Sequence, residues 1–192
     1  MGKSYLLTGK PGVGKTTTLK KIVYGIGIGR CGGFYTEEIR PRDSRTGFRI
    51  VTFDGQQGTI ADVNYSSRIH VGKYGVDIDT LESIGIAAIY EAMEHKELVV
   101  VDEIGPMQLY SDRFKQAILD AVRSSHPLLG TIVSRPYPWA DELKLCPSVE
   151  IRDITLDNRD DLVAELISVL SKALEEQKYN QRLTDRPKNP RC

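Results

Sequence analysis

The sequence has no excess of either charge. It contains 26 basic and 26 acidic residues in a length of 192, so its formal net charge is zero. A protein that binds nucleic acid or an anionic membrane mainly through its charge needs a basic surface. It also lacks any apolar run that approaches the roughly 18 residues of a membrane-spanning helix. The composition therefore predicts neither a nucleic-acid partner nor a membrane partner.

Cysteine and histidine are scarce and scattered. Cys31, Cys146 and Cys192 are odd in number and far apart, which fits neither a disulfide framework nor a metal-binding clip. The three histidines are equally isolated and predict no ligand cluster. Residues 1–10 show no long apolar segment followed by a cleavage site. We therefore expect a protein of the cytoplasm, where cysteines stay reduced.

What the sequence does contain is an alternation of predicted strands and helices. Short apolar runs predict strands at 5–7, 98–101, 128–133 and 148–154. Helical spacing of apolar residues predicts helices at 15–26, 79–95, 111–124, 138–145 and 160–176. Two further strands, 32–40 and 47–53, flank a turn-forming segment and predict an antiparallel pair, with 58–63 as a possible third strand. This order predicts an α/β fold: a mostly parallel sheet, helices on both faces and an antiparallel addition.

Residues 9–16 (GKPGVGKT) match the phosphate-loop pattern GxxxxGK[ST] at every required position. The expected strand before it and helix after it are the context that this pattern requires. In such a loop, backbone amides and the positive end of the helix face the phosphates. Lys15 is expected to reach the β and γ phosphates, and the Thr16 hydroxyl to coordinate Mg²⁺. We expect nucleotide contacts from the whole loop: Gly9, Lys10, Pro11, Gly12, Val13, Gly14, Lys15 and Thr16.

Residues 98–105 (LVVVDEIG) place two acids directly after a buried strand. Asp102 is the candidate that joins Thr16 at Mg²⁺. Glu103 is the candidate for activating the attacking water, the alternative being a carboxylate that only supports neighbouring groups. The segment also satisfies DxxG, the γ-phosphate motif of regulatory GTPases, so Ile104 and Gly105 join the expected nucleotide-binding residues. The guanine motif NKxD is missing from the sequence, which disfavours a GTPase switch.

Longer blocks of the sequence resemble one family. They are GKPGVGKTT at 9–17, GGFYTEEIR at 32–40, VGKYGVDI at 71–78, VVVDEIGPMQLYS at 99–111 and GTI at 130–132. In order and spacing they are similar to the small nucleoside-triphosphatases of thermophiles, a group that vertebrates share as the cancer-related nucleoside-triphosphatase. The sequence departs from that pattern at 133–139 (VSRPYPW), where a more basic or histidine-containing segment is expected. Arg135, in this segment, is a candidate for contacting the developing phosphate charge.

The resemblance implies a phosphate-loop NTPase fold of the additional-strand, recombinase-like type. It also implies Mg²⁺-dependent hydrolysis of ATP, GTP and other nucleoside triphosphates to diphosphate and phosphate, with weak base selectivity. Glu103 and Lys15 would then be catalytic, and Thr16 and Asp102 would hold the metal.

We predict a single domain over residues 1–177. The polar, proline-containing residues 178–192 predict a disordered tail. Two other functions stay open: a nucleotide or small-metabolite kinase, and a slow nucleotide-gated binding module. The sequence leaves the oligomeric state and the physiological substrate undetermined.

Overall fold

The computed structural model describes residues 2–184, and over this part of the chain nine strands form one sheet. The strand order is β5-β6-β4-β3-β2-β7-β8-β1-β9. The strands are β1 (Ser4–Thr8), β2 (Cys31–Ile39), β3 (Gly47–Thr52), β4 (Gln57–Asp62), β5 (His70–Val71), β6 (Tyr74–Val76), β7 (Leu98–Ile104), β8 (Leu128–Ile132) and β9 (Val149–Asp153). The helices are α1 (Lys15–Ile26), α2 (Ile78–Thr80), α3 (Ala87–His95), α4 (Asp112–Arg123), α5 (Pro138–Lys144) and α6 (Arg159–Thr184).

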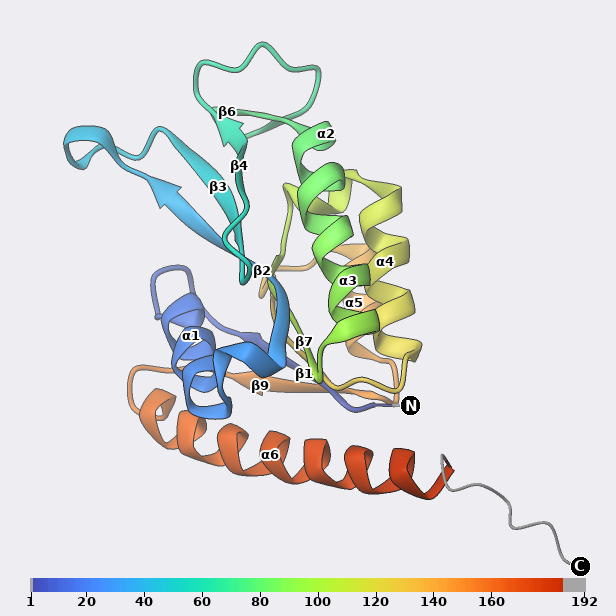
Figure 1. Cartoon of the computed structure of the whole chain (residues 1–192). Coiled ribbons are helices and arrows are strands. Elements are labelled where there is room, and N and C mark those ends of the chain that lie inside the picture. The colour runs from blue at the N-terminus through green and yellow to red at the C-terminus, as the bar shows by residue number, and fades with distance from the viewer. Residues whose placement is uncertain (1, 185–192) are drawn as a thin grey trace, which may run out of the picture.

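The sheet has a parallel half and an antiparallel half. Strands β2, β7, β8, β1 and β9 are parallel to one another, whereas β3, β4, β6 and β5 pair antiparallel beyond β2. Strand β8 lies between β1, which leads into the glycine-rich loop, and β7, which carries the two acids. This is the additional-strand arrangement that the resemblance implied, and the predicted fold class is confirmed (Figure 1).

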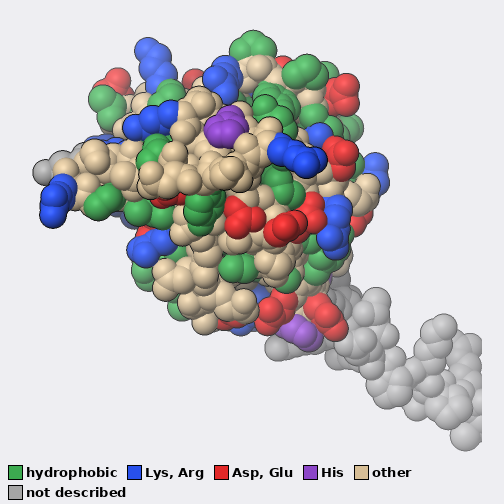
Figure 2. Space-filling model, turned by 90° about the horizontal axis from the view of Figure 1, so that it is seen from above, with side chains coloured by type: hydrophobic (Ala, Val, Ile, Leu, Met, Phe, Trp, Pro, Cys, Tyr) green, Lys and Arg blue, Asp and Glu red, His purple; other side chains and the backbone are tan. Residues whose placement is uncertain are grey.

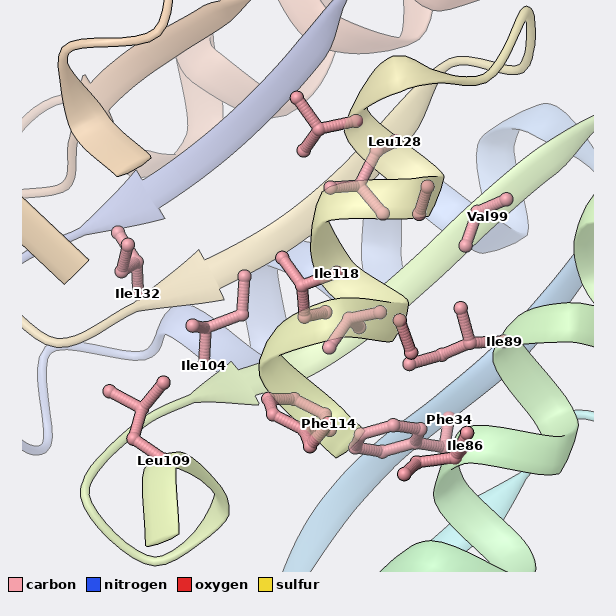
Figure 3. Packing of buried hydrophobic residues seen from close by; sticks show 14 of the residues in the cluster. Phe34, Ile86, Ile89, Val99, Ile104, Leu109, Phe114, Ile118, Leu128 and Ile132 are labelled. Carbon is pink, nitrogen blue, oxygen red and sulfur yellow. The ribbon is translucent and has the colours of Figure 1, made fainter. Parts of the chain in front are cut away.

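Helices cover both faces of the parallel half. Helices α1 and α6 pack on one face through apolar side chains such as Leu19 and Leu166, which contact Leu7 and Val100 of the strands. The other face is covered by α3, α4 and α5. There Phe34 of β2 meets Phe114 of α4 with ring centroids 6.3 Å apart (Figure 3). Because both faces are buried, the central strands are continuous apolar runs, as the sequence predicted.

The β2–β3 hairpin and the strands beyond it project from the body of the molecule (Figures 1 and 2). The predicted antiparallel pair is confirmed, with Glu37 opposite Arg49 and Glu38 opposite Phe48. Within this part, Tyr74 is buried against Phe48 and its hydroxyl accepts a hydrogen bond from Arg45. The VGKYGVDI block therefore forms the outer edge of the antiparallel half of the sheet.

The start of the disordered tail was predicted too early in the sequence. Helix α6 continues to Thr184, so residues 178–184 are helical rather than disordered. Leu174 is fully buried, and one turn later Lys178 pairs with Glu97 at 3.1 Å, which extends the contact of α6 with the domain. The sequence offers no proline to stop the helix before Pro187. The remainder of the predicted tail, 185–192, lies outside the described residues.

The helix predicted at 79–95 is one helical stretch from Ile78 to His95, with a π-helical turn at Leu81–Ile86 between α2 and α3. Among the helices of residues 2–184, none has the length and apolar character needed to cross a bilayer.

Candidate active site

The glycine-rich loop connects β1 to α1 at the edge of the sheet where the parallel strands end. Gly12 and Gly14 have φ angles of 79° and 104°, which residues with a β-carbon rarely adopt. Helix α1 starts after Gly14 with no capping side chain and no acidic residue in its first turn. Its first amide groups and its positive dipole end are therefore available to an anion.

Lys15 lies across this loop. Its Nζ donates hydrogen bonds to the carbonyl oxygens of Gly9, at 3.2 Å, and Lys10, at 3.5 Å. Val13 instead packs its side chain against the apolar cluster under α1, and its N–H donates to the carbonyl oxygen of Lys10 at 3.2 Å. The loop thus brings an ammonium group together with the uncapped start of α1, a combination suited to phosphate oxygens.

Asp102 is buried, with 1% of its surface exposed, and is surrounded by donors. Its carboxylate accepts hydrogen bonds from Thr16 Oγ1 at 2.7 Å, from Thr131 Oγ1 and from the backbone N–H of Thr36. Burial raises the pKa of Asp102, and these three hydrogen bonds oppose that rise. The structure therefore brings Thr16 and Asp102 into direct contact across 86 positions of sequence, as the two motifs predicted.

Glu103 lies beside Asp102 but has different surroundings. Burial and the neighbouring charge of Asp102 raise its pKa, whereas the positive charges of Lys15 and Arg135 lower it. Its side chain lies against Gly105, where an added β-carbon would come within 2.8 Å of Glu103 Oε1. A glycine at position 105 therefore leaves room for the Glu103 carboxyl. This packing explains the glycine of the DxxG pattern.

Ile104 was predicted to bind nucleotide, and the structure limits such a contact to its backbone. Its side chain is fully buried in the cluster under α4 and does not face the loop. Its carbonyl oxygen accepts a hydrogen bond from the N–H of Val133, which fixes β7 to the end of β8. Only the backbone of Ile104 is left for a contact at the site.

Two groups that hold Asp102 were missed from the sequence. Thr131 is the polar member of the otherwise apolar strand β8, and that exception in LLGTI was the signal that could have found it. The N–H of Thr36 carried no signal, because any residue except proline supplies a backbone donor. Both come from the strands that flank β7.

Four basic side chains gather around the loop: Lys10, Lys15, Arg135 and Arg159. Arg135 is close enough to Glu103 to act on its pKa. Arg159 Nη1 lies 3.7 Å from the place that a β-carbon on Gly14 would occupy. In the described part of the chain, none of the four forms an ion pair with a carboxylate. The edge of the sheet therefore carries local positive charge although the whole chain is neutral.

Known proteins share both this sequence and this fold. A family model described as NTPase matches residues 4–167. The nucleoside-triphosphatase THEP1 of Thermotoga maritima is 39% identical over 165 residues, which cover 86% of this chain and 94% of that protein. The crystal structure of THEP1 from the hyperthermophile Aquifex aeolicus is similar with a TM-score of 0.79 and 34% identity, covering 87% of this chain and 98% of that one. The solution structure of a human cancer-related nucleoside triphosphatase is similar with a TM-score of 0.75 and 30% identity, covering 88% and 97%.

Proposed function

The chain belongs to the NTPase family, and we propose that it hydrolyses nucleoside triphosphates to diphosphate and phosphate with Mg²⁺. The observation that carries this proposal is the contact between Thr16 of the glycine-rich loop and Asp102 of β7. It joins a phosphate-binding loop to an acid at one point, which is where a triphosphate and its metal ion would meet.

The loop and Lys15 would hold the phosphates. Backbone amides of the loop and of the first turn of α1 donate to phosphate oxygens, and the Lys15 ammonium neutralises their charge. Because little covalent chemistry falls to the protein in phosphoryl transfer, such positioning and charge compensation supply most of the rate enhancement.

Thr16 at the start of α1 and Asp102 of β7 fit a magnesium ion. The Thr16 hydroxyl and the Asp102 carboxylate are hard oxygen donors, the type that Mg²⁺ prefers, and Mg²⁺ is usually held by one or two such groups together with substrate phosphates. A buried carboxylate whose pKa is raised by burial is also a group that a cation would stabilise in its charged form. Thr16 and Asp102 would hold the metal ion where its positive charge offsets the charge that develops on the phosphate.

Glu103 would act on the attacking water. Its carboxylate takes a proton from the water as the oxygen attacks the γ phosphorus, and the diphosphate leaves. Burial and the charge of Asp102 raise the Glu103 pKa, which makes its carboxylate a stronger base. The positive charges of Lys15 and Arg135 oppose that rise. In this assignment the two adjacent acids have separate roles, Asp102 at the metal and Glu103 at the water.

We also propose weak base selectivity, since the sequence contains no NKxD motif or other base-reading motif.

The free thiols of Cys31 and Cys146 support the prediction of a reducing compartment such as the cytoplasm.

A phosphate-release assay tests the proposal. Nucleoside tri-, di- and monophosphates with adenine, guanine, cytosine and uracil are incubated with the protein, with Mg²⁺ or with a chelator. We expect release from the triphosphates with Mg²⁺ only, and kcat/KM values for the four bases within about tenfold, or 1.4 kcal/mol. Turnover only after addition of an acceptor molecule would favour a kinase instead. A preference of a thousandfold for guanosine would revive the GTPase interpretation.

A further inference from the structure

The segment that connects β9 to α6 lies directly against the glycine-rich loop. The N–H of Ile154 donates to the carbonyl oxygen of Thr8, at 2.7 Å, where β1 ends. The carbonyl oxygen of Ile154 is so close to Gly9 that a β-carbon there would lie 2.6 Å from it. The residues after Ile154 therefore start beside the phosphate-binding loop, at the point where β1 leads into it.

Asn158 fixes the shape of this segment. Its Oδ1 accepts a hydrogen bond from the N–H of Thr155 at 2.8 Å, and its Nδ2 donates to the carbonyl oxygen of Asp153 at 2.9 Å. Its own carbonyl oxygen accepts from the N–H of Leu162, at 2.9 Å, in the first turn of α6. One asparagine thus closes the turn and joins it to the helix, so the backbone of the next residue, Arg159, is held in place.

The side chain of Arg159 reaches back toward the loop. Its Nη1 lies 3.7 Å from the place that a β-carbon on Gly14 would occupy, and Gly14 is the residue directly before α1. The neighbouring Asp160 forms its ion pair with Lys21, at 2.8 Å, although the charge of Arg159 also helps to lower the pKa of Asp160. Within residues 2–184 no carboxylate lies within ion-pair distance of Arg159. A guanidinium that forms no ion pair within the described residues therefore lies beside the start of α1.

The strand order indicates which part of a bound nucleoside triphosphate would lie near Arg159. Glu103 and Arg135 follow β7 and β8, on one side of β1, whereas Arg159 follows β9, on the other side. At about 4.8 Å per strand, β7 and β9 are roughly 14 Å apart. If the γ phosphorus lies beside Glu103, Arg159 is at the far end of the phosphate chain.

We propose that Arg159 binds the phosphates that are not transferred, the α and β phosphates of the nucleotide. A guanidinium suits this position, since it stays charged and can donate two parallel hydrogen bonds to phosphate oxygens. The group makes the same contact with substrate and with the diphosphate product. It therefore contributes to affinity and not to the chemical step, unlike Glu103. This inference rests on the proposed function, in which the ligand is a nucleoside triphosphate.

Calorimetric titration of ADP into the full chain tests the inference. Arg159→Ala should weaken ADP binding by about 10- to 100-fold, the range for loss of a charge-assisted hydrogen bond, and raise the KM for ATP similarly. The kcat should stay within about twofold of the wild type. Arg159→Lys should recover part of the affinity, because the charge returns without the planar fork. Arg123→Ala, which removes an exposed arginine at the end of α4, is the matched control and should change neither value.

Two results would overturn the inference. One is an ADP affinity of Arg159→Ala within twofold of the wild type. The other is a loss of kcat with unchanged affinity, which would place Arg159 at the transferred phosphate. If the wild type binds ADP but releases no phosphate from any triphosphate, the proposed function fails while the ADP affinities still decide the role of Arg159.

Discussion

The hairpin of β2 and β3 and the loop before α1 differ in how their basic side chains are arranged. On the hairpin, Glu37 pairs with both Lys20 and Arg49, at 3.0 and 2.8 Å. Glu38 pairs with Arg45 at 2.6 Å and with Arg40. Around the glycine-rich loop of the described structure, by contrast, Lys15 and its basic neighbours have no carboxylate partner.

The two regions therefore use basic residues for different roles. Paired charges on the hairpin compensate each other and hold strands and helix together, each pair contributing little on an exposed surface. Unpaired charges at the loop create a local positive potential that a neutral chain otherwise lacks. Net charge alone hides this difference, and substitutions in each region should show it.

Removal of the loop ammonium should have the largest effect. We expect Lys15→Ala to lose hydrolysis altogether, because the phosphate charge is no longer neutralised, and to bind nucleotide more weakly as well. The measurement is phosphate release together with calorimetric ADP binding. Lys172→Ala, on an exposed position of α6, is the control and should behave as the wild type. A Lys15→Ala variant that turns over at a near-normal rate would show that the site is misassigned.

Glu103→Gln should have the second-largest effect. The amide keeps the shape of the side chain but cannot take a proton, so we expect single-turnover hydrolysis to fall by roughly 10²–10⁴-fold. Triphosphate affinity should survive or improve, since one negative charge near the γ phosphate is gone. Asp102→Asn is the comparison and should instead lose activity that high Mg²⁺ partly restores. Equal behaviour of the two variants over a Mg²⁺ titration would argue against separate roles for the two acids.

Thr131→Val should have a smaller effect through the same site. It removes one of the hydrogen bonds that Asp102 accepts and leaves a buried carboxylate less satisfied, at a cost of about 1–3 kcal/mol. We expect a lower unfolding midpoint in urea and a higher Mg²⁺ requirement for hydrolysis. Thr131→Ser keeps the hydroxyl and should restore both. If Thr131→Val needs no more Mg²⁺ for hydrolysis than the wild type, the hydroxyl does not position Asp102.

Glu37→Gln, on the hairpin, should have the smallest effect and a distinct pH dependence. Hydrogen bonds from Arg49 and then Lys20 lower the pKa of Glu37 below its usual value. The pair therefore stabilises the fold above the unfolded-state pKa, and this contribution is lost as the pH falls through the folded-state value. Urea denaturation at pH 7 should show a loss of at most about 1 kcal/mol for the variant.

At a pH near 3 the difference between Glu37→Gln and the wild type should shrink. Hydrolysis should change by less than about threefold, or 0.7 kcal/mol, because the paired charges do not serve the substrate. A loss of activity comparable to that of Thr131→Val would contradict the division between the two regions.

The parts of the molecule that the sequence predicted are those whose signals are local. The loop pattern at 9–16 is contiguous, and the apolar run before Asp102 shows a strand buried on both faces. The meeting of Thr16 and Asp102 could be predicted as well, because parallel strands end at one edge of a sheet. The family resemblance added the position of β8 between β1 and β7, which no local pattern contains.

The features that were missed depend on packing between distant elements. Ile104 was grouped with the site by the DxxG pattern, but the irregularity in β7 between Val101 and Ile104 places its side chain in the core. The end of α6 was predicted from composition, whereas Lys178 is held by Glu97, a residue that precedes β7. Arg159 lies just before the helix predicted at 160–176 and was given no role, and only the contact of the β9–α6 segment with Gly9 and Gly14 brings it to the loop.

The place of β1 in the sheet has a consequence for synthesis on the ribosome. Strand β1 precedes both of its neighbours in the chain, because β8 and β9 come from residues 128–153. During synthesis the nucleotide-binding loop is therefore made before the strands that hold β1 in the sheet. We expect bound nucleotide to stabilise only those intermediates in which β8 and β9 have already been made.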